Sequence, residues 1–134
     1  MKRVLIVEPN YPESGFATKL AAAVLEMAID ANDDSLLSDL HRYPKGNLPN
    51  PPDLIIIDRR TGWIWLTRSR EIKNLAPNIP MWFIGKKDMT EGQAEKLTEY
   101  PSINEDDLTG FVADTEVELV NMVAKELRRL IIPN

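Results

Sequence analysis

The stretch Asp53-Leu-Ile-Ile-Ile-Asp58 decides the fold of this chain, and Pro49-Asn-Pro-Pro52 leads into it. Four consecutive apolar residues, three of them β-branched, predict a strand that is buried on both faces, which is typical of the centre of a parallel sheet. We therefore expect this stretch to be the middle strand. Asp58 would then lie at the carboxyl end of the strand, the edge at which open α/β sheets place their ligands and reacting groups.

Strands and helices are predicted to alternate on both sides of this stretch. Besides the central strand, we expect strands at Arg3–Glu8, Leu25–Asp30, Ile79–Ile84 and Gly110–Val112. Helices are expected at residues 14–24, 33–43, 68–75, 88–100 and 115–131. Five strands alternating with helices predict an α/β fold with a doubly wound, five-stranded parallel sheet, most simply in the order 2-1-3-4-5 of flavodoxin-like and receiver folds.

Local sequence features predict where two of the helices begin and suggest one short strand. Ser14 is a candidate cap for the first helix, and Thr115-x-x-Glu118 has the spacing of a capping box for the last one. The last helix should bury a single stripe of apolar side chains. That stripe contains Val117, Val120, Ala124, Leu127 and Ile131. The segment Leu25–Asp30 alternates in polarity as a half-buried strand does, although no Gly or Pro separates it from the helix before it.

Composition limits the classes of function. A chain of 134 residues suits a single domain over residues 1–134. The formal net charge of -5 argues against binding to nucleic acid or an anionic membrane, because both require a surface rich in Lys and Arg. The absence of cysteine and the single histidine exclude disulfides and a zinc site built from these residues. We expect a cytoplasmic protein, since the lack of cysteine is consistent with a reducing compartment.

The predicted fold raises the question of phosphoryl transfer to Asp58. A receiver domain phosphorylates the acid of its central strand, with a divalent cation held by that acid and by an acidic pair after the first strand. Glu8 matches one acid of that pair, but Pro9 stands in place of the other. Gly85 replaces the hydroxyl residue after the fourth strand, and Ala113-Asp114 replaces the Lys-Pro after the fifth. We therefore expect Glu8, Asp58 and Gly85 to be degenerate receiver positions without catalysis or metal binding. Asp58 would then be a solvated or Arg-paired carboxylate.

A second candidate site is a protein interface. Trp63 and Trp65 lie two residues apart in a predicted loop, and Arg68 follows in a basic helix. Tryptophan and arginine are the residue types that dominate interface energies, so these three are candidate contact residues. Packing of both tryptophans over the sheet edge is the alternative. The arginines of this region could also bind an anionic regulatory ligand or simply balance the acidic surface.

Three parts of the sequence resemble the amino-terminal receiver-like "wing" domain of the bacterial ornithine/lysine/arginine decarboxylases. They are Met1–Glu8, Asn78–Thr90, and Gly110–Leu119 together with Leu130–Pro133. The resemblance spans nearly the whole chain, and its more specific marks are Asp114-Thr115 before the last helix and the Leu/Ile-Pro exit. The chain departs from the commonest pattern at Ala113, where an aromatic or acidic residue is more usual.

The resemblance implies a non-catalytic domain at the amino end of a longer decarboxylase. In that family the wing helps to assemble dimers and higher oligomers, so a homo-oligomer is expected. A following domain binds pyridoxal phosphate through a lysine in a Ser-x-His-Lys setting. No lysine in this chain follows a histidine, so the cofactor is expected in the parent protein and not here. The alternative is a stand-alone degenerate receiver that acts as a protein-binding signalling module.

Overall fold

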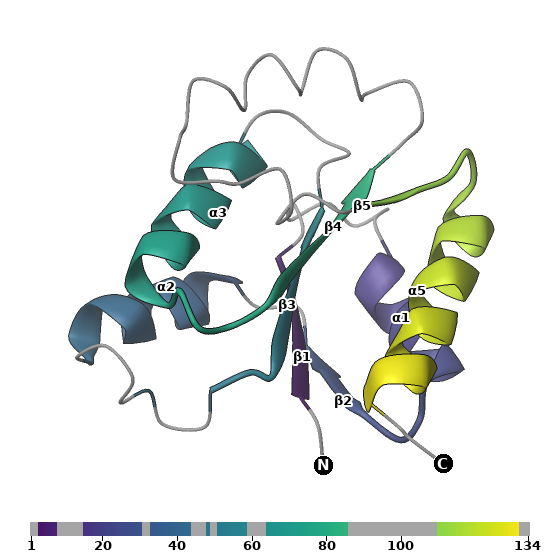
Figure 1. Cartoon of the computed structure of the whole chain (residues 1–134), viewed down its shortest axis with the longest axis horizontal. Coiled ribbons are helices and arrows are strands. Elements are labelled where there is room, and N and C mark those ends of the chain that lie inside the picture. The colour runs from purple at the N-terminus through teal and green to yellow at the C-terminus, as the bar shows by residue number, and fades with distance from the viewer. Residues whose placement is uncertain are drawn as a thin grey trace.

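The chain folds into a five-stranded, all-parallel sheet in the order β2-β1-β3-β4-β5, with helices on both faces (Figure 1). A computed structural model describes residues 3–7, 15–30, 33–43, 48, 51–58, 64–85 and 110–131. The strands are β1 (Arg3–Val7), β2 (Ala28–Asp30), β3 (Leu54–Asp58), β4 (Met81–Gly85) and β5 (Gly110–Val112). The helices are α1 (Phe16–Ala23), α2 (Asp33–Arg42), α3 (Ile64–Leu75) and α5 (Glu116–Ile131). This architecture confirms the predicted flavodoxin-like α/β fold.

The central position of β3 is confirmed. Every residue of β3 is buried, and the strand is paired with β1 on one side and β4 on the other. Ile56, for example, lies beside Ile6 of β1 and Trp82 of β4. A strand with neighbours on both sides and helices on both faces has no contact with water, which explains its unbroken apolar run.

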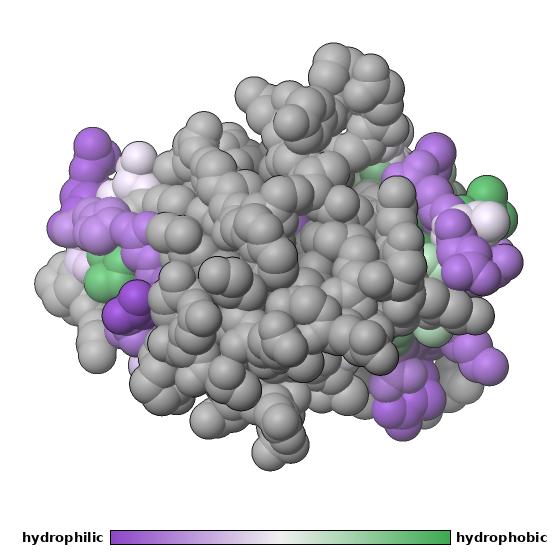
Figure 2. Space-filling view, turned by 90° about the horizontal axis from the view of Figure 1, so that it is seen from above, coloured by the Kyte–Doolittle hydropathy of each residue, from purple (hydrophilic) through white to green (hydrophobic). Residues whose placement is uncertain are grey.

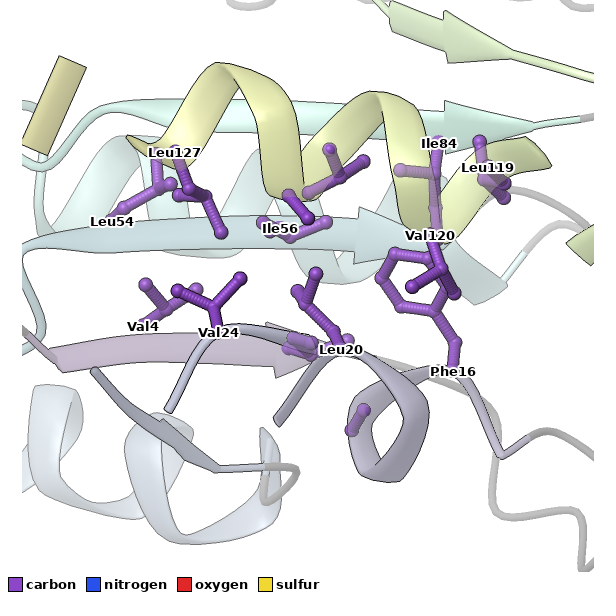
Figure 3. Packing of buried hydrophobic residues seen from close by; sticks show 14 of the residues in the cluster. Val4, Phe16, Leu20, Val24, Leu54, Ile56, Ile84, Leu119, Val120 and Leu127 are labelled. Atoms are coloured by element: carbon purple, nitrogen blue, oxygen red, sulfur yellow. The ribbon is translucent and has the colours of Figure 1, made fainter. Parts of the chain in front are cut away.

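Side chains alternate between two core layers. Because successive residues of a strand point to opposite faces, the even-numbered residues of β1, β3 and β4 pack against α1 and α5, and the odd-numbered ones pack against α2 and α3. The first layer includes Val4, Ile6, Leu54, Ile56 and Ile84. The second includes Leu5, Val7, Ile55, Ile57, Met81 and Phe83, with Leu40 and Ile72 from the helices. Figure 3 shows the first layer, where Phe16 and Leu20 of α1 and Val120 of α5 meet over β3.

The region between α1 and β2 differs from the prediction in its boundaries. The N-cap of α1 is Gly15 and makes no side-chain cap; Ser14, the expected cap, lies outside the described residues. Strand β2 exists but is only three residues long. Leu25 is 81% exposed, although the alternating pattern grouped it with Met27, which is buried. The reason is that residues 25–27 form a turn, so the alternation of a strand does not apply to them.

The structure of α5 agrees with part of the predicted capping box and with part of the predicted apolar stripe. The hydroxyl of Thr115 accepts a hydrogen bond of 3.2 Å from the Glu118 N–H, as a capping box requires. Val117 is 66% exposed, so its predicted burial is wrong. The buried stripe consists of Leu119, Val120, Val123, Ala124 and Leu127. Val117 lies in the first turn, at the margin of this stripe. The side chain of Ile131 is outside the described part.

The helix predicted at residues 88–100 and the acidic segment that follows it lie outside the described residues. None of the helices in the described part of the chain combines the length and the apolar character that a membrane-spanning helix requires.

Candidate functional site at the carboxyl edge of the sheet

Asp58 is the last residue of β3 and is only 2% exposed. It lies beside Ile84 of β4 in the register of the sheet. By alternation it belongs to the same face as Ile56, the face covered by α1 and α5. The position of Asp58 at the carboxyl end of the central strand is therefore as predicted, but this burial excludes the solvated carboxylate that was one of the two structural expectations. Pairing of Asp58 with an arginine stays a prediction.

Two further receiver positions come together at the same edge. Gly85 ends β4 and is buried, beside Val112 of β5. The Ala113 N–H donates a 3.4 Å hydrogen bond to the Gly85 carbonyl, and Ala113 is 3% exposed. A receiver would have a hydroxyl at the first of these positions and a lysine at the second. A hydrogen atom and a methyl group can neither bond to a phosphoryl oxygen nor balance its charge.

The described residue that follows Ala113 carries a negative charge. Asp114 follows Ala113 and is exposed. It therefore adds negative charge where a receiver carries a cation. Glu8, the third degenerate position, lies outside the described residues. Among the residues that are described, no group of three or more acidic, histidine or cysteine side chains could hold a metal ion.

The structure describes only the backbone of two of the three candidate interface residues. Trp65 is the second residue of α3, so the prediction that it lies in a loop is wrong. A helix can begin at Ile64 because no helix-breaking Gly or Pro lies between Gly62 and Pro77. Trp63 lies outside the described residues, as do the side chains of Trp65 and Arg68. Their role in an interface stays a prediction.

Contacts between helices supply features that sequence patterns did not reveal. His41 of α2 is within hydrogen-bond distance of Glu71 of α3 through its Nε2. Lys19 of α1 pairs with Glu116 of α5. Arg128 of α5 donates to the Ala23 carbonyl at the carboxyl end of α1, where a cation is favoured by the helix dipole. These partners are 30 to 105 residues apart in the sequence, so no local spacing could have indicated them.

The described lysines do not fit pyridoxal phosphate. Lys19 and Lys125 are exposed, and Lys73 is half-buried. A lysine that carries this cofactor is activated by burial or by a neighbouring charge inside a closed pocket. None of these three side chains is buried.

The described side chains beside the carboxyl edge are mainly polar. Figure 2 views the molecule from that edge, and the described side chains on the side of α1 and α5 are mostly hydrophilic, with a small hydrophobic area among them. The large hydrophobic side chains exposed within the described residues are Leu25, Val117 and Met122. Two of the three, Val117 and Met122, belong to α5.

The fold and the edge together define a flavodoxin-like α/β domain whose Gly85 and Ala113 positions lack the groups that receivers use for phosphoryl transfer. No protein-family model matches the sequence, and a search of curated proteins gave no significant match.

Proposed function

We propose that this chain is a cytoplasmic, non-catalytic receiver-like domain that assembles or regulates a pyridoxal-phosphate-dependent decarboxylase of ornithine, lysine or arginine. Two observations support the proposal. The strand order 2-1-3-4-5 is the one expected of the wing domain that the sequence resembles. The three described lysines, Lys19, Lys73 and Lys125, are not buried, which agrees with a proposal that places the carboxy-lyase chemistry outside the described residues.

The identities of Gly85 and Ala113 are the observation that supports a non-catalytic role. Phosphoryl transfer depends almost entirely on positioned charges and donors that stabilise the transferred group. The Ala113 methyl group and the Gly85 hydrogen stand where two of those donors are needed, and their backbones are joined by a hydrogen bond. Asp58 alone cannot supply the missing stabilisation. A domain of this kind acts through its surface.

The chain should therefore stay unphosphorylated when it is incubated with acetyl phosphate and Mg²⁺. The absence of a lysine at Ala113 leaves the charge of a phosphoryl group on Asp58 unbalanced. Intact-mass spectrometry should find the mass of the untreated protein, and a phosphorylatable receiver treated in parallel provides the positive control. A stoichiometric phosphoryl adduct on the wild-type chain that is absent from Asp58→Asn would contradict the proposal.

A stand-alone degenerate receiver is the alternative, and the polar surface of the described helices fits it equally well. The two hypotheses differ in the reading frame after Asn134. A pyridoxal-phosphate domain encoded there would support the decarboxylase, whereas a stop codon would favour the separate signalling module.

A further inference from the structure

Helix α5 carries an exposed stripe of one acidic, one apolar and one basic side chain. Glu118 and Lys125 are seven residues apart, so they lie on the same face of the helix, and Met122 lies between them. Glu118 and Lys125 are exposed, and Met122 is 41% exposed. We call Glu118, Met122 and Lys125 the α5 stripe. It faces away from the core, because the buried face of α5 is formed by other residues such as Val123 and Leu127.

The charges around the α5 stripe are engaged within the chain. Glu116 and Arg128 both hold α1, through Lys19 and through the Ala23 carbonyl. Arg129 donates two hydrogen bonds to Glu126, at 2.6 Å and 3.2 Å. The hydrogen bond from Arg129 also holds the pKa of the Glu126 carboxyl below its ordinary value. Glu118 and Lys125 are therefore the charges that flank Met122 on the outer surface of α5.

We propose that a second copy of this chain docks on the α5 stripe, with the two α5 helices antiparallel about a twofold axis. The inference rests on the proposed role in assembly and specifies the surface that performs it. The midpoint between Glu118 and Lys125 falls next to Met122. A twofold axis through that point brings each Glu118 opposite Lys125 of the partner subunit and places the two methionines near the axis.

The charges of Glu118 and Lys125 decide whether the two α5 helices pack parallel or antiparallel. With the helices parallel, a twofold axis would bring Glu118 against Glu118 and Lys125 against Lys125, and like charges at contact distance repel. The antiparallel arrangement replaces these with two equivalent ion pairs. A 16-residue helix is about 24 Å long, so one helix pair buries less than the roughly 800 Å² per partner of a standard interface. The dimer formed by this contact is therefore weak and depends on protein concentration.

Charge reversal on the α5 stripe provides the test. In Glu118→Lys and in Lys125→Glu, both ion pairs become like-charge pairs, which should weaken self-association roughly tenfold. The double variant restores both pairs in the opposite sense and should associate like the wild type. An equimolar mixture of the two single variants should form a heterodimer, since every pair across its interface is again of opposite sign. Sedimentation velocity over a concentration series measures the self-association of the wild type, of each variant and of the mixture.

Two controls separate association from folding. Glu26→Lys reverses an exposed charge in the turn between α1 and β2 and should leave association unchanged. Thermal melting of each variant shows that the chain stays folded, which matters because Glu118 also lies in the first turn of α5, where the dipole favours an acid. Each variant is compared with the wild type at a temperature well below its melting point.

The possible results distinguish a failure of the α5 contact from a failure of the proposed role in assembly. Recovery of association in the double variant and in the mixture supports the antiparallel contact. If the wild-type chain associates and the single variants associate equally well, the α5 stripe is not the contact surface. The role in assembly would then belong to another surface. Weakening without recovery also contradicts the antiparallel contact. A wild-type chain that stays monomeric at every concentration contradicts the role in assembly itself.

Discussion

Replacing Phe16 with alanine should lower the free energy of unfolding by about 3–5 kcal/mol. Phe16 is the first residue of α1 and is fully buried. Its ring lies next to Val120 of α5 and Ile84 of β4 (Figure 3). Removing the ring leaves a cavity where two helices and the sheet meet, and the surrounding backbone can close it only partly. Equilibrium denaturation with urea measures the loss.

The matched control is Thr18→Ala, two residues further along the same helix. Thr18 is exposed, so its truncation should change the free energy of unfolding by no more than about 0.5 kcal/mol. A loss below about 1 kcal/mol for Phe16→Ala would mean that the contact between α1 and the sheet is not the core that the structure shows.

Leu127→Ala should have the second-largest effect, a loss of about 2–5 kcal/mol. Leu127 is fully buried and packs α5 against the same layer of the core. Met122 lies on the same helix but on its outer face. Met122→Ala should therefore change the stability of the monomer by only about 0.5 kcal/mol, and it should weaken self-association instead. Urea denaturation combined with sedimentation velocity measures both quantities for both variants.

This pair of variants separates the two faces of α5. If Met122→Ala lowered the free energy of unfolding as much as Leu127→Ala does, the outer face would be part of the core and could not serve as a contact surface. If Leu127→Ala left the stability of the chain unchanged, the packing of α5 on the sheet would be wrong.

Much of the fold could be predicted because its pattern is local. The apolar run at Leu54–Ile57 required burial on both faces, and only a central parallel strand provides that. The errors arose where tertiary contacts outweighed the pattern. Leu25 alternates correctly for a strand but lies in a turn, and Val117 has helical spacing but lies at the margin of the buried stripe of α5. The sequence predicts a loop at Trp65, whereas α3 begins one residue before it.

The candidate site was predictable in its location and not in its detail. Strand ends indicated that Asp58 and Gly85 lie at the same edge, and the register of β3, β4 and β5 confirms this. The burial of Asp58 could not be predicted, because it depends on how the neighbouring segments pack over the edge. The hydrogen bond between Ala113 and Gly85 depends on the pairing of two strands that are far apart in the sequence. The α5 stripe could not be recognised either, since it required knowing which face of α5 the core covers.

The central claim is that this domain works by surface contact and not by phosphorylation of Asp58. Sedimentation velocity of the chain over a concentration series, with and without acetyl phosphate and Mg²⁺, tests it most directly. We expect concentration-dependent self-association that is the same in both conditions, because the positions of Gly85 and Ala113 carry neither the hydroxyl nor the lysine with which a receiver stabilises a phosphoryl group. A chain that stays monomeric until acetyl phosphate is added, and associates only then, would contradict the account.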